Sequence, residues 1–260
     1  SVPFNRNGVT RFDNAKWLIL EDDTTNHKAK IIRTTPLTYA EAGVTPPVAE
    51  GGGDATGTDA SAMLTFLPTD SSGYDTYFDS SGNNNYGKTG DGGVAISPVR
   101  KAVENYYTNM TNTADKARVL AIKQDYPNFA TFSYNQGLTI REGEDSGSAT
   151  ATNWKRDYDA AGLDNRYSTI LDSSGGTLTA FVPTISDILG GSSVELTNKG
   201  NFLHGAATIS TWLASPGDQD NSVLILHRGM FPADAKITET DEGTTIHETS
   251  PVHPAFWISY

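Results

Sequence analysis

The chain has no cysteine among its 260 residues. Disulfide bonds, cysteine-bound metals and thiol nucleophiles are therefore excluded. No apolar run approaches the roughly 18 residues that a membrane-spanning helix needs, so we expect no membrane insertion. Basic residues are also scarce, because 19 Lys and Arg stand against 31 Asp and Glu, which gives a formal net charge of -12. Such a charge repels phosphate groups, and we expect no nucleic-acid partner.

Small and polar residues are abundant instead, with 25 glycines and many Asn, Asp, Ser and Thr residues. Without cysteine, this composition is typical of bacterial and phage surface proteins, so we expect an extracellular location, on a cell surface or a virion. The sequence begins at Ser1 with no initiator Met and no apolar signal core. We therefore expect a mature or trimmed chain that lacks its leader, anchor or upstream domain. Its length suits a single domain over residues 1–260.

Two segments have clear signals for local structure. Residues 17–20 and 29–33 are β-rich runs on either side of a polar turn, which predicts a hairpin. Residues 98–110 predict the main helix, because Ser97 can cap it and Pro98 suits its first position. The apolar stripe of this helix consists of Val99, Val103, Tyr106 and Tyr107.

The rest of the chain has weaker signals. A short helix is predicted over residues 186–189, with Thr184 or Ser186 as its cap. Segments rich in Thr, Val and Ile between Gly, Asp and Asn turns predict short strands, and the fold class is therefore α+β. Two stretches, residues 45–93 and 143–176, read as long loop-rich insertions, although an apolar run in the first of them predicts one short strand.

The quartet Asp-Ser-Ser-Gly occurs three times, at residues 70–73, 79–82 and 172–175. Asp and Ser side chains bond to their own backbone and Gly supplies a positive φ, so local turns explain the repeat without a ligand. The alternative is a calcium ion, because Asp70, Asp75 and Asp79 offer hard oxygen ligands. We expect no obligatory cofactor, with Ca²⁺ as the alternative.

Five landmarks follow one another along the chain: a strand pair around WLIL at 17–20, SPVRKAVENYY at 97–107, FVPTISDIL at 181–189, WLASPG at 212–217 and SPVHPAFWI at 250–258. Their order resembles a bacterial and phage family of unknown function whose members have a WLRSPG turn and end in VRPAFWI. The resemblance extends over residues 12–258. That family is similar to the C-type-lectin-like fold of formylglycine-generating enzymes and of some variable phage receptor-binding domains. The resemblance thus implies a C-type-lectin-like core of twisted antiparallel strands with one main helix.

The resemblance also implies roles for residues of the last two motifs. Trp212 and the segment 215–217 would form a turn before a central strand at 223–226, and Pro254 and Trp257 would lie in a closing strand. His253 stands where the family has Arg, so a buried salt bridge of that Arg is not expected here. Large aromatic side chains favour the core, and we predict both tryptophans there.

We predict that the protein is not an enzyme. Formylglycine-generating enzymes hold copper with a cysteine pair, which this chain lacks. Related iron-dependent enzymes use clustered histidines, whereas His27, His204, His227, His247 and His253 are scattered, so only a site assembled in space stays open. No nucleophile elbow, zinc-protease motif or phosphate loop occurs. A hydrolase using a carboxylate pair such as Asp218 with Asp220 is the second alternative.

The candidate ligand-binding residues lie in the loop 217–222 and just after the following strand. Asp218, Gln219, Asp220 and Asn221 offer oxygens that suit sugar hydroxyls or calcium, and His227 and Arg228 add hydrogen-bond donors. A solvated loop is the alternative reading.

These features favour a binding module of the adhesin or phage receptor-binding type, with a glycan or a surface protein as partner. The first alternative is a structural subunit of an extracellular filament, pilus, phage tail or virion that binds copies of itself. Asn109 lies in an Asn-x-Thr sequence that would accept a glycan in a suitable source.

Overall fold

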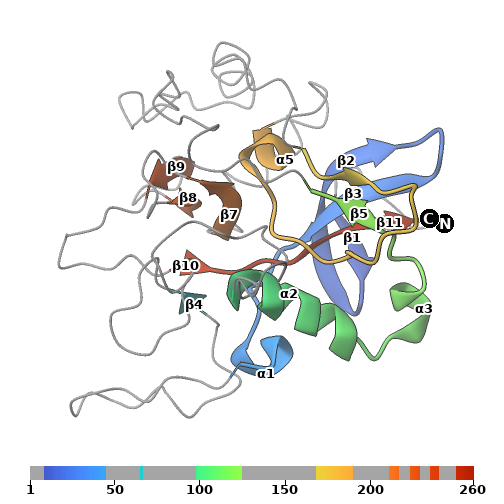
Figure 1. The fold of residues 1–260 in the computed structure, drawn as a ribbon, viewed down its shortest axis with the longest axis horizontal. Helices are drawn as coiled ribbons and strands as arrows, with labels where there is room; N and C mark the ends of the chain where they lie inside the picture. The colour runs from blue at the N-terminus through green and yellow to red at the C-terminus, as the bar shows by residue number, and fades with distance from the viewer. Residues whose placement is uncertain are drawn as a thin grey trace.

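The computed structural model describes residues 9–44, 65–66, 98–124, 168–189, 211–216, 223–228, 235–239 and 250–260. The architecture is mixed α and β, with a curled antiparallel sheet, smaller antiparallel strand groups and few helices (Figure 1). The α+β prediction is therefore confirmed at this level. None of the helices in the described ranges is both long and apolar enough to cross a bilayer.

The main sheet has four antiparallel strands in the order β1-β2-β3-β11. They are β1 (Val9–Phe12), β2 (Ala15–Asp23), β3 (Lys28–Arg33) and β11 (Ala255–Ser259). Asp13 and Asn14 link the first two strands with φ of 47° and 58°, a left-handed pair that suits a tight hairpin turn. The predicted hairpin corresponds to β2 and β3, and its partner on the far side is the last strand.

Side chains alternate between the two faces of this sheet. Ile31 in β3 lies directly opposite Phe256 in β11, and both belong to the hydrophobic core cluster. Their neighbours Lys30 and Trp257 also lie opposite each other, and therefore point to the other face. Both faces are buried, so the sheet is an inner layer of the domain.

Helix α2 (Pro98–Asn109) covers the Phe256 face of the sheet (Figure 1). Its bounds agree with the predicted helix at 98–110. Val99, Val103 and Tyr106 are buried, as the predicted stripe requires, and Tyr107 packs against the edge of the core. The Tyr106 ring stacks on Phe256, with ring centroids 6.0 Å apart.

Two shorter helices flank α2. Helix α1 (Tyr39–Ala42) packs against it. Thr38 and Glu41 form a reciprocal capping box at its start, and Gly43 closes it with a φ of 64° that favours glycine. Helix α3 (Thr113–Lys116) follows α2 and is capped by Asn112. These caps explain how such short helices persist.

The opposite face of the sheet receives α5 (Ile185–Leu189), which contacts β2. Thr184 caps this helix, as the sequence predicts, because its Oγ1 accepts a hydrogen bond from the Asp187 N–H at 3.1 Å. The preceding residues run beside β11, where Phe181 and Ala255 form an isolated antiparallel bridge. The last strand is thus flanked on both edges.

The remaining strands form three small groups. A three-stranded sheet has the order β7 (Thr211–Pro216), β8 (Val223–Arg228) and β9 (Ala235–Glu239). The pairs are β4 (Thr65–Phe66) with β10 (Ser250–Pro251) and β5 (Ile122–Lys123) with β6 (Ile170–Leu171). The short strand predicted within 45–93 corresponds to β4. The stretch 143–176 was expected to be loop-rich, yet it contains β6, whose pairing with β5 follows from tertiary contacts rather than local sequence.

Candidate functional site

The predicted binding loop connects β7 to β8. Pro216 pairs with Val223, so residues 217–222 join two antiparallel neighbours. Within this loop, Asp218, Gln219, Asp220 and Asn221 lie outside the described residues. The structure therefore neither brings them together nor separates them.

His227 and Arg228 were expected to follow the strand, but both belong to β8 itself. They pair with Lys236 and Ala235 of β9, so the ladder extends two residues beyond the predicted end. The β8 strand is central in its sheet, as the resemblance implied. Strand pairing on both sides lengthens β8, a cause that the local sequence does not reveal.

The WLASPG motif is also more extended than expected. Residues 211–216 form β7, with a register irregularity between Trp212 and Pro216, rather than a turn. Trp212 is fully buried, and Trp257 is buried as well, which confirms both as core residues. The closing strand begins at Ala255, one residue after Pro254.

The base of β7 is fixed to the rest of the domain. The Ala214 N–H donates to the Pro183 carbonyl at 2.8 Å, just before α5. Thr211 Oγ1 accepts from the His253 N–H at 3.2 Å. His253 is buried and places Nδ1 2.8 Å from the Arg33 carbonyl oxygen. The histidine thus bonds to backbone at this position.

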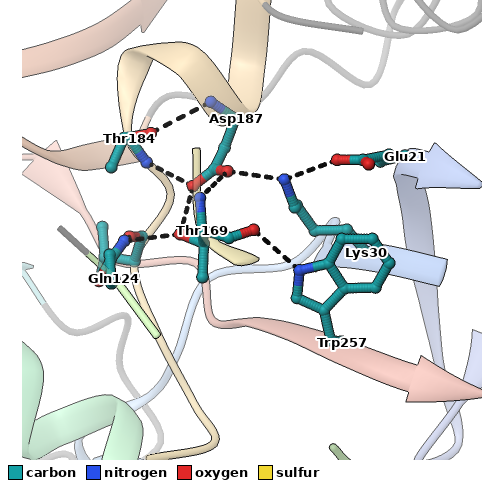
Figure 2. A network of polar contacts seen from close by, with 8 residues as sticks. Glu21, Lys30, Gln124, Thr169, Thr184, Asp187 and Trp257 are labelled. Atoms are coloured by element: carbon teal, nitrogen blue, oxygen red, sulfur yellow. Dashed lines mark hydrogen bonds and ion pairs between the residues drawn. The ribbon is translucent and has the colours of Figure 1, made fainter. Parts of the chain in front are cut away.

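A second group of polar side chains lies beneath α5, and we name it the Lys30 cluster (Figure 2). Its members come from six separate places along the chain and are joined by hydrogen bonds and ion pairs. They are Glu21, Lys30, Gln124, Thr169, Thr184, Asp187 and Trp257. Sequence analysis assigned no function to any of them.

The strands place three members side by side. Trp257 lies opposite Lys30 on one side, and Glu21 lies opposite it on the other. A β-bulge between Ile19 and Glu21 shifts the register by one residue, and without it Leu20 would face Lys30. The bulge therefore brings a carboxylate to the ammonium group. Lys30 Nζ lies 2.9 Å from Glu21 Oε2 and 5.2 Å from the centre of the Trp257 ring.

Asp187 occupies the middle of the cluster. Its Oδ1 accepts from Lys30 Nζ at 2.9 Å and from the Thr169 N–H at 2.8 Å. Its Oδ2 accepts from Thr169 Oγ1 at 2.7 Å and from the Thr184 N–H at 2.9 Å. The last contact completes a reciprocal cap with the Thr184 hydroxyl, so the same carboxylate starts α5 and anchors it to β3.

Both charges of this central pair are buried, with 2% of the Lys30 side chain and 0% of the Asp187 side chain exposed. Burial alone would raise the pKa of Asp187, but Lys30 and the hydrogen bonds from Thr184 and Thr169 hold it below its usual value. Burial alone would lower the pKa of Lys30, but Asp187 and Glu21 raise it overall. The pair is therefore ionised at neutral pH.

Thr169 links the charged pair to its neighbours. Its Oγ1 accepts from Gln124 Nε2 at 2.9 Å while it donates to Asp187. Its carbonyl oxygen accepts from the Trp257 indole N–H at 2.9 Å. The Gln124 amide also donates to the Val182 carbonyl at 2.9 Å. These contacts fix the orientation of the carboxylate from several directions.

Two sequence signals point to part of this cluster. The spacing of Thr184 and Asp187 is that of a capping box, and Lys30 interrupts the apolar run of β3. Glu21 gives no such signal, because its position depends on the bulge. Within the described ranges, no group of three His, Asp or Glu side chains could hold a metal ion.

A second buried cation lies near the main helix. Arg33 binds Glu41 with both terminal nitrogens, at 3.0 and 2.7 Å, and its guanidinium lies 5.0 Å from the centre of the Tyr106 ring. The Tyr106 hydroxyl donates to Asp13 Oδ2 at 2.6 Å. Burial and this hydrogen bond raise the pKa of Tyr106. These contacts join α1, α2 and the first hairpin.

The structure also explains the third Asp-Ser-Ser-Gly quartet. Asp172 Oδ1 accepts from the Ser174 N–H at 2.8 Å and from its hydroxyl, and Gly175 has a φ of 84°. This is the predicted turn chemistry. The other two quartets lie outside the described residues, and so do the candidate calcium ligands Asp70, Asp75 and Asp79.

Comparison with known proteins adds no relative. No family model matches the chain, and no curated protein or solved structure is significantly similar to it.

Proposed function

We propose that this chain is an extracellular, non-enzymatic binding module with a C-type-lectin-like core, whose ligand is a glycan or a surface protein. The fold proposal is supported by the antiparallel main sheet and the long helix α2 against it. It is also supported by the two motifs near the C-terminal end of the sequence, because Trp212 to Ala214 in β7 and Ala255 to Ile258 in β11 are buried strand residues.

The observation that best supports a binding role is the anchoring of β7. Its residues 211–214 are buried, and Ala214 bonds to Pro183 beside α5. The helix is in turn attached to β3 through Asp187 and Lys30. The connection 217–222 thus departs from a strand that is fixed to the main sheet. A fixed base lets a connecting segment vary in sequence without loss of the fold, as binding loops require.

The buried charges support a structural role for the polar interior. Lys30, Arg33 and Asp187 each bond to partners that join separate segments of the fold. We therefore place ligand recognition in the loop and at the end of β8, and assign these buried groups to the architecture.

A triple substitution tests this proposal. Asp218→Ala, Asp220→Ala and Asn221→Ala together should change the free energy of unfolding by less than about 1 kcal/mol, as is usual for surface positions. The same variant should lose attachment to a glycan array or to bacterial surfaces that the unchanged protein binds. The matched control is Thr24→Ala with Thr25→Ala, two exposed residues of the β2–β3 turn, which should melt and attach normally.

Retained attachment by a normally folded triple variant would contradict the loop assignment. Light scattering that rises with protein concentration, in the absence of glycan binding, would favour the alternative of a filament or virion subunit.

A further inference from the structure

The Lys30 cluster places a primary amine against a carboxyl group in a buried setting. Lys30 Nζ and Asp187 Oδ1 are 2.9 Å apart, and the two residues are separated by 157 positions in the sequence. Both side chains are almost completely inaccessible to water. We propose that these two side chains condense into an amide bond, which joins β3 covalently to α5 in a chain that has no cysteine for a disulfide.

The reaction is a dehydration that needs no other reactant. A proton passes from the Lys30 ammonium to the Asp187 carboxylate, which leaves a neutral amine beside a carboxylic acid. The Nζ lone pair then attacks Cγ, a bond forms between nitrogen and carbon, and the bond from Cγ to Oδ1 breaks. Oδ1 leaves as water. It carries the proton already transferred from the ammonium group and a second proton that the attacking nitrogen gives up. No atom is oxidised or reduced.

The two oxygens of Asp187 have different surroundings that suit these roles. Oδ2 accepts from Thr169 Oγ1 and the Thr184 N–H, at 2.7 and 2.9 Å. These donors would stabilise the negative charge that develops on Oδ2 in the tetrahedral intermediate. Oδ1 accepts from Lys30 Nζ at 2.9 Å and from the Thr169 N–H at 2.8 Å, and because it faces the ammonium group it is placed to receive protons and leave. After reaction, Oδ2 becomes the amide oxygen and keeps both donors.

Glu21 provides the route for the proton. Its carboxylate lies 2.9 Å from Lys30 Nζ, and 44% of its side chain is exposed, in contrast to the buried pair. It can therefore accept the proton that the nitrogen loses as the new bond forms, and the carboxyl group thus formed returns a proton, directly or through solvent, to the leaving Oδ1. The bulge in β2 that turns Glu21 toward Lys30 thus has a chemical consequence.

Two physical effects favour the amide over the separate groups. The amide carries no charge, whereas the ion pair buries two charges. Burial of those charges costs desolvation free energy, which the amide avoids. The fold also holds the two groups in contact, and fixed reactants reach effective concentrations of about 10⁵–10⁸ M. In dilute solution water drives the same equilibrium toward hydrolysis, so the folded structure is required. The ion pair is the starting state, and the initial proton transfer makes the reaction slow.

This inference does not depend on the proposed ligand, because a crosslink would serve a binding module and a filament subunit equally. It is a single event within one chain, with no turnover of an external substrate. It also has a simple physical signature, the loss of one water molecule.

Mass spectrometry of the intact, denatured protein tests the proposal. The folded chain, incubated for days at neutral pH, should be lighter than its sequence by the mass of one water molecule. Proteolysis should release a branched peptide that contains Lys30 and Asp187. The crosslinked chain should also migrate faster on a denaturing gel, because two residues 157 positions apart stay joined and close a loop.

Two variants sharpen the result. Lys30→Arg keeps the positive charge and cannot form the amide, so it should retain the full mass. Glu21→Gln keeps the Lys30–Asp187 pair and should slow water loss at least about tenfold, as expected for removal of a general base. An unchanged rate in Glu21→Gln would overturn the role given to Glu21.

A full sequence mass after prolonged incubation of the folded protein would overturn the proposal, and so would recovery of Lys30 in a linear peptide. Water can also be lost by cyclisation at Asp91-Gly92. Peptide mapping separates the two reactions, and water loss confined to Asp91 would likewise overturn the crosslink.

Discussion

The two faces of the main sheet are buried by different means. One face is covered by aromatic rings, in which Trp17 lies 5.4 Å from Phe256 and 6.5 Å from Tyr106, measured between ring centroids. The other face carries the Lys30 cluster, where hydrogen bonds and charges decide the fit. Apolar packing stabilises the fold in proportion to the apolar area that it buries, and different sets of apolar side chains can fill the same space. A buried polar network holds its members through hydrogen bonds of fixed direction, so the bonds to Asp187 and Thr184 fix the position of α5.

The largest effect should follow from Asp187→Ala, which breaks the polar face. The change leaves the Lys30 charge with only the Glu21 carboxylate, and it removes the acceptor of Thr169 and the carboxylate half of the reciprocal cap of α5. Breaking a buried ion pair costs about 3–5 kcal/mol, and loss of a helix cap adds about 1 kcal/mol. Chemical denaturation should report this loss. A stability within 1 kcal/mol of the unchanged protein would mean that the cluster is not a unit.

Truncation of one tryptophan on each face compares the two directly. Trp17→Ala and Trp257→Ala should each cost about 3–5 kcal/mol, because each removes a large buried side chain. Trp257→Ala should also disturb Thr169, whose carbonyl loses the indole donor. Thermal melting measures the loss of stability in each variant. Hydrogen exchange of the backbone amides of residues 184–188 should accelerate in Trp257→Ala but not in Trp17→Ala. Equal exchange in both variants would show that the faces are not independent.

Helix caps provide a smaller comparison. Thr38 caps α1 beside the aromatic face, and Thr184 caps α5 above the polar face. Each substitution to Ala should cost about 1 kcal/mol. Thr184→Ala should cost the more of the two, because its hydroxyl orients the residue that holds Lys30. A larger loss of unfolding free energy in Thr38→Ala than in Thr184→Ala would contradict this prediction.

Acid should weaken both faces gradually. Burial raises the pKa of Glu41, but Arg33 and Thr38 lower it more, so its pKa lies below its usual value. A lowered pKa means that the unfolded chain binds the proton first. The stability that Glu41 supplies is present above about pH 4.3, its usual pKa, and is lost as the pH falls through the native pKa. Asp187 follows the same sign.

Melting between pH 7 and pH 3 tests this effect in matched variants. Glu41→Gln should melt lower than the unchanged protein at neutral pH and show a shallower fall toward acid. An amide at Asp187 would leave no carboxylate to titrate there. Lys30→Arg keeps this carboxylate free, so its melting temperature should fall more steeply toward acid than that of the unchanged, crosslinked protein. Identical profiles for all three proteins would exclude both carboxylates as the source of acid sensitivity.

Local sequence was sufficient for the β2–β3 hairpin, for α2 and for the start of α5. In each case neighbouring residues encode the element, such as Pro98 with the stripe of Val99 and Val103, or Thr184 before Asp187. The burial of Trp212 and Trp257 also followed from residue type. Pairing between distant segments did not follow, since β5 with β6 and β11 with β3 depend on tertiary contacts.

The Lys30 cluster shows where sequence reasoning reaches its limit. A bulge decides that Glu21 rather than Leu20 faces Lys30, and no local pattern in β2 announces it. Thr169 and Gln124 are ordinary polar residues until the fold brings them to Asp187. The polar loop 217–222 attracted attention because its composition is conspicuous, whereas the charged interior is dispersed over the whole chain.

The position of β11 determines when this protein can fold. The strand lies between β3 and the segment that contains Phe181. Just before it, His253 contacts Arg33, a residue 220 positions earlier in the sequence. A ribosome that adds about 5–20 residues per second needs about 10–40 s to supply that interval. During translation β3 therefore presents an open edge, which favours aggregation. The main sheet is complete only after β11 has left the ribosome, and a nascent chain that stalls before residue 255 offers this edge to chaperones or proteases.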